Sequence, residues 1–255
     1  MTQDQFWAQL SQAMSDLDPE ERQGLVFLHG YNVDFDAAAI RAAQIGYDLK
    51  VPGATAFFSW PSCGTVAAYP ADESCIEASE PYIAEFLQDF VTKSGLSRVH
   101  LVAHSMGNRG LLRALQRLGT RLTEARAIPF GQIILAAPDI DAQVFSGLAN
   151  LYPQFGERTT LYASPADRAV AISQWIHRYP RAGLTPPVTV VPGVDTIEVP
   201  HFNVFELLGH GYYAEAEALL HDMFDLIRRN APPKDRQRLL ATQTTSGHDY
   251  WIMSR

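Results

Sequence analysis

The sequence predicts an α/β fold with a mostly parallel sheet that is covered by helices on both faces. Short apolar runs recur along the chain, and such runs are typical of strands that are buried on both faces. Segments with helical periodicity lie between these runs. This alternation is typical of parallel strands joined by crossover helices. A chain of 255 residues suits one such domain, so we expect residues 1–255 to form a single domain.

Each expected strand is an apolar run of four or five residues. These runs lie at 24–28, 54–58, 99–103, 133–136, 159–162, 188–191 and 196–199. Each expected helix repeats apolar residues about one turn apart. The helical patterns lie at 3–20, 36–49, 81–91, 106–122, 167–176 and 212–227. We expect residues 1–23 to be an N-terminal helical segment. Residues 231–255 look like a loosely specified C-terminal extension, whose apolar end should dock on this chain or on a neighbour.

The composition indicates a globular protein without a nucleic-acid partner. The chain is 47% hydrophobic and 19% charged, and its formal net charge is −8. No basic block is present that would attract a phosphate backbone. The eight histidines are scattered without ligand spacing, so we expect no metal. No glycine-rich phosphate loop occurs, so we expect no nucleotide cofactor.

The termini and the cysteines bear on the cellular compartment. The first residues lack the charged-then-apolar pattern of a secretory signal, and no apolar stretch is long enough to span a membrane. We therefore expect a cytoplasmic protein. Cys63 and Cys75 are too few for a disulfide framework. We expect free thiols, with a bond between the two as the alternative.

Ser105 has the local sequence of a nucleophile on a sharp turn between a strand and a helix. Such a turn is strained, so the residues two before and two after the serine must be small. Here they are Ala103 and Gly107. The apolar run 99–103 precedes the serine and a leucine-rich helical pattern follows it. The alternative is a serine that merely caps a helix.

These motifs resemble the α/β-hydrolase superfamily. The resemblance is carried by Ala103-His104-Ser105-Met106-Gly107-Asn108 and His29-Gly30-Tyr31-Asn32, although alanine replaces the first glycine of the usual G-x-S-x-G pattern. More narrowly, the chain is similar to a bacterial subgroup named domain of unknown function 900, on the further motifs Phe58-Ser59-Trp60-Pro61-Ser62, Ala136-Ala137-Pro138-Asp139 and Leu208-Gly209-His210-Gly211-Tyr212-Tyr213. The resemblance runs from about residue 24 to about residue 225. It implies the α/β-hydrolase fold and serine-hydrolase chemistry, but says little about the substrate.

The fold implies an oxyanion hole of two backbone N–H groups. One donor follows the nucleophile, which makes it Met106, at the start of a helix where unpaired N–H groups favour an anion. The other comes from the loop after the strand 24–28, and by resemblance we expect it to be Tyr31. We expect the side chain of His29 to have a structural role.

The acid and base of a triad follow the nucleophile in this fold, in the order Ser, Asp or Glu, His. Asp167 follows the strand at 159–162 and opens a helix, so it is the expected acid, with Asp139 as the alternative. A plain N-cap role for Asp167 remains open. His210 is the expected base because the flanking glycines allow the ring to be presented, with His201 as the alternative.

The expected site has a small lid or none, because only about twenty residues, 139–158, separate two strands there. We expect Trp60, Tyr69 and Tyr212 to line the substrate pocket. An open serine site suggests a small-molecule ester of a short-chain acid as substrate. An amidase, an acyltransferase and a non-catalytic interaction protein remain alternatives. The apolar C-terminal end makes a homodimer plausible.

Overall fold

The computed structural model of the chain describes residues 1–121, 130–200 and 214–254. In these ranges the chain forms an eight-stranded sheet in the order β2-β1-β3-β4-β5-β6-β8-β7. Neighbouring strands run parallel, except for the final pair, β7 and β8. The strands are β1 (Gln23–Leu28), β2 (Ala54–Phe58), β3 (Arg98–His104), β4 (Phe130–Ala136), β5 (Gly156–Ala163), β6 (Asp195–Glu198), β7 (Leu239–Gln243) and β8 (Asp249–Met253).

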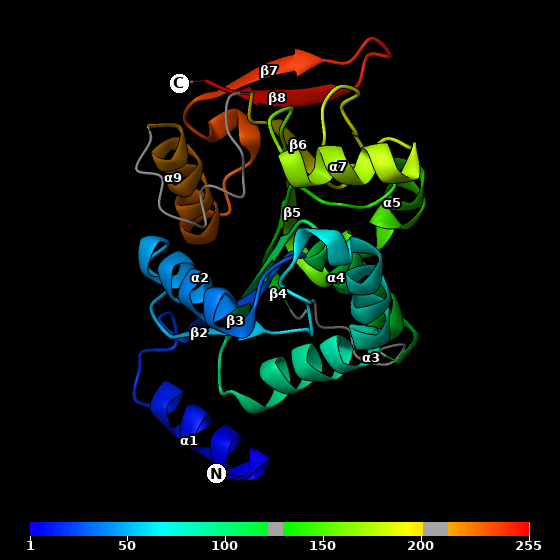
Figure 1. Ribbon diagram of the computed structural model, residues 1–255. Coiled ribbons are helices and arrows are strands. Elements are labelled where there is room, and N and C mark those ends of the chain that lie inside the picture. Colours follow the sequence, from blue (N-terminus) through cyan, green and yellow to red (C-terminus); the bar gives the residue numbers. More distant parts are fainter. Residues whose placement is uncertain (122–129, 201–213, 255) are drawn as a thin grey trace.

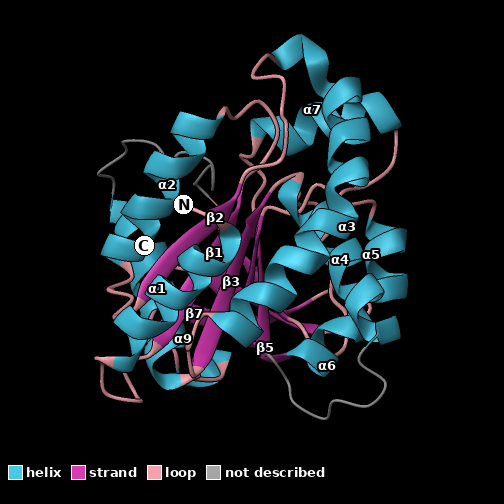
Figure 2. Ribbon diagram, turned by 90° about the horizontal axis from the view of Figure 1, so that it is seen from below, coloured by secondary structure: helices cyan, strands magenta, loops and turns pink. Residues whose placement is uncertain are grey.

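Helices cover both faces of this sheet (Figures 1 and 2). The described α-helices are α1 (Gln3–Ser15), α2 (Phe35–Asp48), α3 (Tyr69–Lys93), α4 (Gly107–Arg121), α5 (Ala142–Leu148), α6 (Tyr152–Phe155), α7 (Arg168–His177) and α9 (Ala214–Arg229). Short 3-10 turns lie at η1 (Val66–Ala68), η2 (Ala149–Leu151) and η3 (Pro233–Asp235). None of the helices in the described ranges is long and apolar enough to cross a membrane.

The core is divided between the two faces because side chains alternate along each strand. On β3, Leu101 and Ala103 belong to the apolar cluster that includes the inner faces of α3 and α4, whereas Val102 belongs to the cluster under α2 and α9. Figure 1 shows these two helix pairs on opposite sides of the sheet. Residues 99–104 of β3 are all buried, as expected for a central parallel strand. The predicted α/β fold is thus confirmed.

One expected strand is absent. Residues 188–191 run beside the sheet without joining a described strand. The position next to β5 is taken by β6, which pairs Thr160 with Asp195 and Ala163 with Glu198. Prolines at 186, 187 and 192 flank the run, and proline lacks the N–H that a strand ladder needs. The run is tied to β6 by a side chain instead, because the Thr196 hydroxyl donates to the carbonyl of Thr189 at 2.9 Å.

The C-terminal extension is a defined part of the sheet, contrary to the prediction of a loosely specified tail. β7 and β8 form a hairpin, and β8 pairs in parallel with β6 through Ile197–Trp251 and Glu198–Ile252. Figure 1 shows the hairpin at one edge of the molecule. The apolar end therefore docks on this chain, one of the two expected outcomes. The edge strand β7 escaped prediction because it lacks the continuous apolar run of a buried strand, whereas the run at 250–253 predicts only a docking segment, which the structure places as β8 between β6 and β7.

Two helices differ in length from their prediction. The expected helix at 3–20 ends at Ser15, after a start fixed by a capping box of Thr2 and Gln5. The expected helix at 81–91 begins twelve residues earlier, at Tyr69, and carries Pro81 inside it. This extension matters for the site, because it adds Tyr69, Asp72 and Glu73 to α3.

Candidate active site

Ser105 occupies a strained turn between β3 and α4. Its φ is +48°, in the left-handed region that residues other than glycine seldom adopt. Hydrogen bonds hold this conformation: Ser105 N–H donates to the carbonyl of Ala136 at 2.9 Å, and the Asn108 side-chain amide donates to Ala103 and Ser105 carbonyls at 3.1 Å each. The Ser105 hydroxyl is buried and makes no hydrogen bond to the described residues. The predicted strand–serine–helix arrangement is therefore present.

Two glycines allow the loop after β1 to pack directly on this turn. A Cβ on Gly107 would lie 2.5 Å from the carbonyl oxygen of His29, and 2.7 Å from that of Leu28. A Cβ on Gly30 would lie 2.8 Å from His104 Nδ1 and 3.0 Å from Ser105 Cβ. Both positions therefore exclude a larger side chain, and residues 29–31 lie against the serine.

The two expected oxyanion donors flank Ser105. Met106 follows the serine in the chain, and Tyr31 follows Gly30 in the adjoining loop. Among the described residues, neither backbone N–H has an acceptor. Such N–H groups are available to a charged oxygen. The Tyr31 ring is buried against Tyr69, with ring centroids 5.2 Å apart.

A buried carboxylate that the sequence reading missed holds the Tyr31 loop in place. Asp72 of α3 accepts hydrogen bonds from the backbone N–H of Asn32 at 3.2 Å and of Cys63 at 2.7 Å, and from the Ser62 hydroxyl at 2.7 Å. It is 0% exposed. One side chain thus joins the loops that follow β1 and β2. Nothing in the local sequence indicates this role, because its three donors come from two distant segments.

Two histidines near Ser105 are packing residues. The Trp60 ring stacks on His29, with centroids 4.9 Å apart, and its indole N–H donates to the His29 carbonyl at 2.9 Å. Burial lowers the pKa of His29, and burial followed by the charge of Arg41 lowers the pKa of His104 to about 3. Both rings are therefore uncharged near neutral pH, which agrees with the structural role expected for His29.

Asp167 lies where the acid was expected, directly after β5 at the N-terminus of α7. It is fully buried, and its Oδ1 accepts the N–H of Val170 at 3.0 Å, so the residue is an N-cap. A carboxylate can accept about four hydrogen bonds through its two oxygens. The cap is therefore compatible with a second role for this side chain.

Asp139, the alternative acid, has partners on both of its carboxylate oxygens. The Tyr69 hydroxyl donates to its Oδ2 at 2.5 Å, and Ser173 Oγ donates to its Oδ1. Arg109 Nη2 lies 3.3 Å and Arg181 Nε 3.6 Å from the same Oδ1. The backbone N–H of Asp139 donates to the Ser105 carbonyl at 3.2 Å. Asp139 thus supports the serine turn through its backbone, while its carboxylate serves other elements.

These contacts belong to a larger buried group, which we term the Asp139 cluster. It consists of Tyr69, Glu73, Arg109, Asp139, Ser173, His177 and Arg181. It joins α3, α4 and α7 to the segment after β4. Burial lowers the pKa of Arg109, but the neighbouring charge of Asp139 and the contacts with Tyr69 and Glu73 raise it to a net increase. Burial and the charge of Asp139 raise the pKa of Tyr69, which keeps its hydroxyl protonated as a donor.

Two of the three expected substrate-lining residues are described by the structure, and both are buried. Trp60 is 1% exposed and Tyr69 is 2% exposed, and the hydroxyl of Tyr69 is engaged in the Asp139 cluster. Tyr212, the expected base His210 and its alternative His201 lie outside the described residues. The described structure therefore brings together Ser105, Met106 and the Tyr31 loop.

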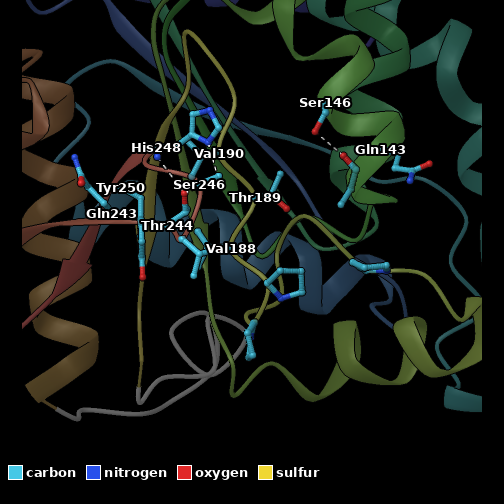
Figure 3. Close-up of a pocket in the computed structure, with 15 residues that line it drawn as sticks. Gln143, Ser146, Val188, Thr189, Val190, Gln243, Thr244, Ser246, His248 and Tyr250 are labelled. Atoms are coloured by element: carbon cyan, nitrogen blue, oxygen red, sulfur yellow. Dashed lines mark hydrogen bonds between the residues drawn. The ribbon is translucent and has the colours of Figure 1, made fainter.

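A separate groove opens away from this serine turn. Its volume is about 860 Å³, and it lies between α5, residues 186–190 and the turn of the β7–β8 hairpin (Figure 3). Its lining includes Gln143, Thr189 and His248, and none of the predicted site residues. In the described part of the chain no group of three or more His, Cys, Asp or Glu side chains could hold a metal ion. Cys63 and Cys75 are free thiols.

Comparison with known proteins agrees with this fold. Residues 5–229 match the family described as "Alpha/beta hydrolase of unknown function (DUF900)". No curated protein matches the chain significantly. Among solved structures, a protein from Bacillus cereus ATCC 10987 is 12% identical over 84% of this chain and 62% of its own, with a TM-score of 0.52.

Two further solved structures show similar overlap. Lipase B of Aspergillus fumigatus is 12% identical over 82% of this chain and 53% of its own, with a TM-score of 0.50. Dienelactone hydrolase from Anabaena variabilis ATCC 29413 is 12% identical over 80% and 84%, with a TM-score of 0.48. At 12% identity, the likeness to the Bacillus cereus protein and to lipase B extends to the fold alone. The match over residues 5–229, together with the serine turn, shows that this chain belongs to the DUF900 family of α/β hydrolases.

Proposed function

We propose that this hydrolase cleaves carboxylic esters of short-chain acids through an acyl-enzyme on Ser105. The observation that carries the proposal is the turn at Ser105. The serine holds a φ of +48° at the carboxyl end of β3, and its buried hydroxyl makes no hydrogen bond to the described residues. A strained left-handed turn that presents a serine at the carboxyl end of a central strand is the geometry that a nucleophile requires in this fold. A nucleophile needs its oxygen kept available.

The proposed reaction uses the serine turn, the two N–H donors beside it and His210 as the base. Ser105 Oγ attacks the ester carbonyl carbon while His210 takes the hydroxyl proton, and the N–H groups of Met106 and Tyr31 donate to the oxygen that becomes negative. His210 returns the proton to the leaving alcohol, and the C–O bond of the ester breaks. Water then attacks the acyl-enzyme with His210 as base, which releases the acid and restores Ser105.

Asp167 is the proposed orienting acid because the carboxylate of the alternative, Asp139, is engaged by other side chains. Both carboxylate oxygens of Asp139 are engaged within the Asp139 cluster, by the Tyr69 hydroxyl and by Ser173 Oγ. Oδ1 of Asp167 accepts the N-cap hydrogen bond of α7, and the same carboxylate can accept a further hydrogen bond. Its place after β5 follows the chain order of this fold.

His210 is the proposed base for two reasons. Its place in the chain follows the order of the triad, and His29, His104 and His177 are buried or held by other contacts. The rings of His29 and His104 are buried, and their pKa values are lowered by that burial. His177 Nε2 lies 2.8 Å from Glu73, and its Nδ1 lies 2.8 Å from the Ser173 carbonyl, so both ring nitrogens are engaged. The glycine-flanked His210 is supported by the order Ser, Asp, His.

Short-chain esters are the proposed substrates because the chain between β4 and β5 is compact. Residues 142–155 form α5, η2 and α6, and buried side chains such as Phe145 and Tyr152 pack them onto the sheet. This segment therefore serves as packing and leaves little chain for a large lid. A series of p-nitrophenyl esters of increasing acyl length tests the point. Activity that falls with length supports the proposal, and higher activity on long chains contradicts it.

Labelling with a fluorophosphonate tests the nucleophile directly. Wild-type protein should be labelled, and Ser105→Ala should lose both the label and ester hydrolysis while its circular dichroism and thermal unfolding remain those of a folded protein. The control is Ser146→Ala, since Ser146 is exposed on α5 and should not affect labelling. A folded Ser105→Ala protein that keeps its label and activity would overturn the proposal. Labelling with activity on amides but none on esters would replace the esterase by an amidase.

A further inference from the structure

The outer face of α7 carries a row of exposed apolar side chains, which we term the α7 stripe. It comprises Ile172, Trp175 and Ile176, whose spacing of three and four residues places them on one side of α7, and Tyr179, which follows the left-handed C-cap Arg178 just beyond the end of the helix. They are 42%, 82%, 40% and 61% exposed, respectively. Single exposed apolar residues are ordinary, but contiguous ones mark an interaction surface.

The stripe is not part of the core because α7 packs with its other side. Val170 and Ser173 are 0% exposed, and Ser173 Oγ donates to Asp139. His177 lies 2.8 Å from Glu73 of α3 on the same inward side. The helix is thus fixed by polar contacts beneath it, which leaves the apolar row directed away from the sheet.

The charge of the surrounding chain differs from that of the protein as a whole. The formal net charge of the chain is −8, yet residues 168–194 contain three arginines and neither Asp nor Glu. Arg178 is exposed beside the stripe, whereas Arg181 is buried against Asp139. Two acids contact α7 and its C-terminal end from neighbouring elements: Glu73, which lies against Arg109 and His177, and Asp139, which lies against Arg109 and Arg181. The stripe therefore lies in a region without unpaired acidic groups from those elements.

A hollow beside the stripe combines apolar walls with one cation. Its volume is about 510 Å³, and it is lined by Trp175, Tyr179, Pro180 and Leu184 together with Arg178. A guanidinium next to aromatic and aliphatic walls is suited to a phosphate that carries acyl chains. Tryptophan and tyrosine are the side chains that prefer the boundary between lipid and water.

We propose that the α7 stripe docks the protein on the surface of a bilayer that contains anionic phospholipids. Isoleucine and tryptophan side chains enter the boundary of head groups and acyl chains, while Arg178 pairs with lipid phosphate. The exposed cation Arg178 suits an anionic surface, whereas the rest of this acidic chain is repelled by it, which orients the protein with α7 toward the membrane. The proposal concerns attachment, and it holds whatever reaction Ser105 performs.

Vesicle binding by the full chain tests the proposal. Co-sedimentation is measured with vesicles of phosphatidylcholine alone and with vesicles in which about one third of the lipid is phosphatidylglycerol. We expect binding to the second kind, weakened by salt, and a blue shift of tryptophan emission. The blue shift is assigned to α7 because Trp175 is 82% exposed, whereas Trp7 and Trp60 are buried and Trp251 is partly buried on β8; loss of the shift in the Trp175 variant separates Trp175 from Trp251.

Variants assign the binding to the stripe. Trp175→Ser with Ile176→Ser should reduce the partition coefficient by about tenfold or more and abolish the blue shift, and Arg178→Gln should reduce the preference for anionic vesicles. Tyr47→Ser is the matched control, because Tyr47 is 84% exposed on α2 and should leave binding unchanged. Circular dichroism and thermal unfolding establish that each variant is folded.

Four outcomes would overturn the proposal. These are no binding to either vesicle, equal binding to both, undiminished binding by the folded double variant, and an effect of Tyr47→Ser as large as that of the double variant. A fifth outcome comes from light scattering without vesicles, which measures the oligomeric state of the protein. A dimer that dissociates in the double variant would show that a second copy of this chain covers the stripe.

Discussion

The hydroxyl of Tyr69 donates a hydrogen bond to Oδ2 of Asp139 at 2.5 Å, and both side chains are almost fully buried. The bond joins the first turn of α3 to the segment that follows β4. Arg109 of α4 donates to the same hydroxyl at 2.7 Å, so the tyrosine accepts from a cation and donates to an anion. The backbone of Asp139 in turn contacts Ser105. Asp139 thus connects the buried hydrogen bond with Tyr69 to the turn at Ser105.

Tyr69→Phe should destabilise the protein by about 1–3 kcal/mol, because it leaves a buried carboxylate oxygen and an arginine N–H with one partner fewer. Denaturant unfolding measures the change. Tyr82→Phe serves as the control, since Tyr82 is 64% exposed on the same helix, and should leave stability within the error. Equal stability of the two variants would mean that the Tyr69 hydroxyl is not a working part of the cluster.

Asp167→Asn should lower the rate of catalysis, whereas Asp139→Asn should lower mainly the stability of the fold. If Asp167 orients the base, Asp167→Asn should lower kcat by about 10⁴-fold, as for a triad with the wrong histidine tautomer. Asp139→Asn should leave kcat within about tenfold but lower the unfolding free energy, because a buried ionic group is disrupted. Steady-state kinetics on an ester and thermal unfolding give both quantities. The reverse pattern in kcat would move the acid to Asp139.

Asp72→Asn should lower kcat with little change in KM. Its carboxylate accepts from the backbone of Asn32 and Cys63, and an amide presents two hydrogens where only acceptors fit. The Tyr31 loop would then be less well placed to stabilise the oxyanion, whose donors are each worth about 10²–10³ in kcat when removed entirely. Asp36→Asn, an exposed change in the first turn of α2, is the control. A rise in KM alone would assign Asp72 to substrate binding instead.

Gly107→Ala should destabilise the fold by about 1–3 kcal/mol, the usual cost of overpacking. The added Cβ would meet backbone oxygens of His29 and Leu28, which cannot move as a flexible side chain can. Gly147→Ala is a matched control within α5, because nothing lies within 4 Å of its Cβ position. That control should be neutral or stabilising, since alanine favours a helix. Thermal unfolding compares the two, and equal melting temperatures would contradict the prediction.

Arg236→Met should destabilise the protein by about 3–5 kcal/mol, because it strands a buried carboxylate. The Arg236 guanidinium is 0% exposed and pairs with Asp222 of α9, and its Nη2 donates to the Tyr162 hydroxyl at 2.9 Å. Denaturant unfolding measures the loss. Arg229→Met is the surface comparison, since that side chain is 71% exposed and 3.8 Å from Asp225, and should change stability by less than about 1 kcal/mol. Similar losses from both would contradict a special role for the buried pair.

Much of the sheet could be predicted because its central strands are buried on both faces. The runs at 24–28, 99–103 and 133–136 are apolar without interruption, and the structure places each of them in the sheet. The same criterion failed at the edge. It accepted 188–191, which is apolar but flanked by prolines, and it missed the edge strand β7, whose apolar run is short, and β8, whose strand partners β6 and β7 are known only from the folded chain.

The sequence by itself determined the turn at Ser105 and its setting between β3 and α4. The requirements there are local, because a strained serine needs small residues two positions before and after it, and both can be read from the adjacent sequence. Only the tertiary structure decided what surrounds that serine. The carboxylate of Asp72 holds the Tyr31 loop, the partners of Asp139 come from helices far apart in the chain, and the α7 stripe is exposed because Ser173 faces inward. These depend on which segments meet, and a buried charge is stable only where its partners are assembled.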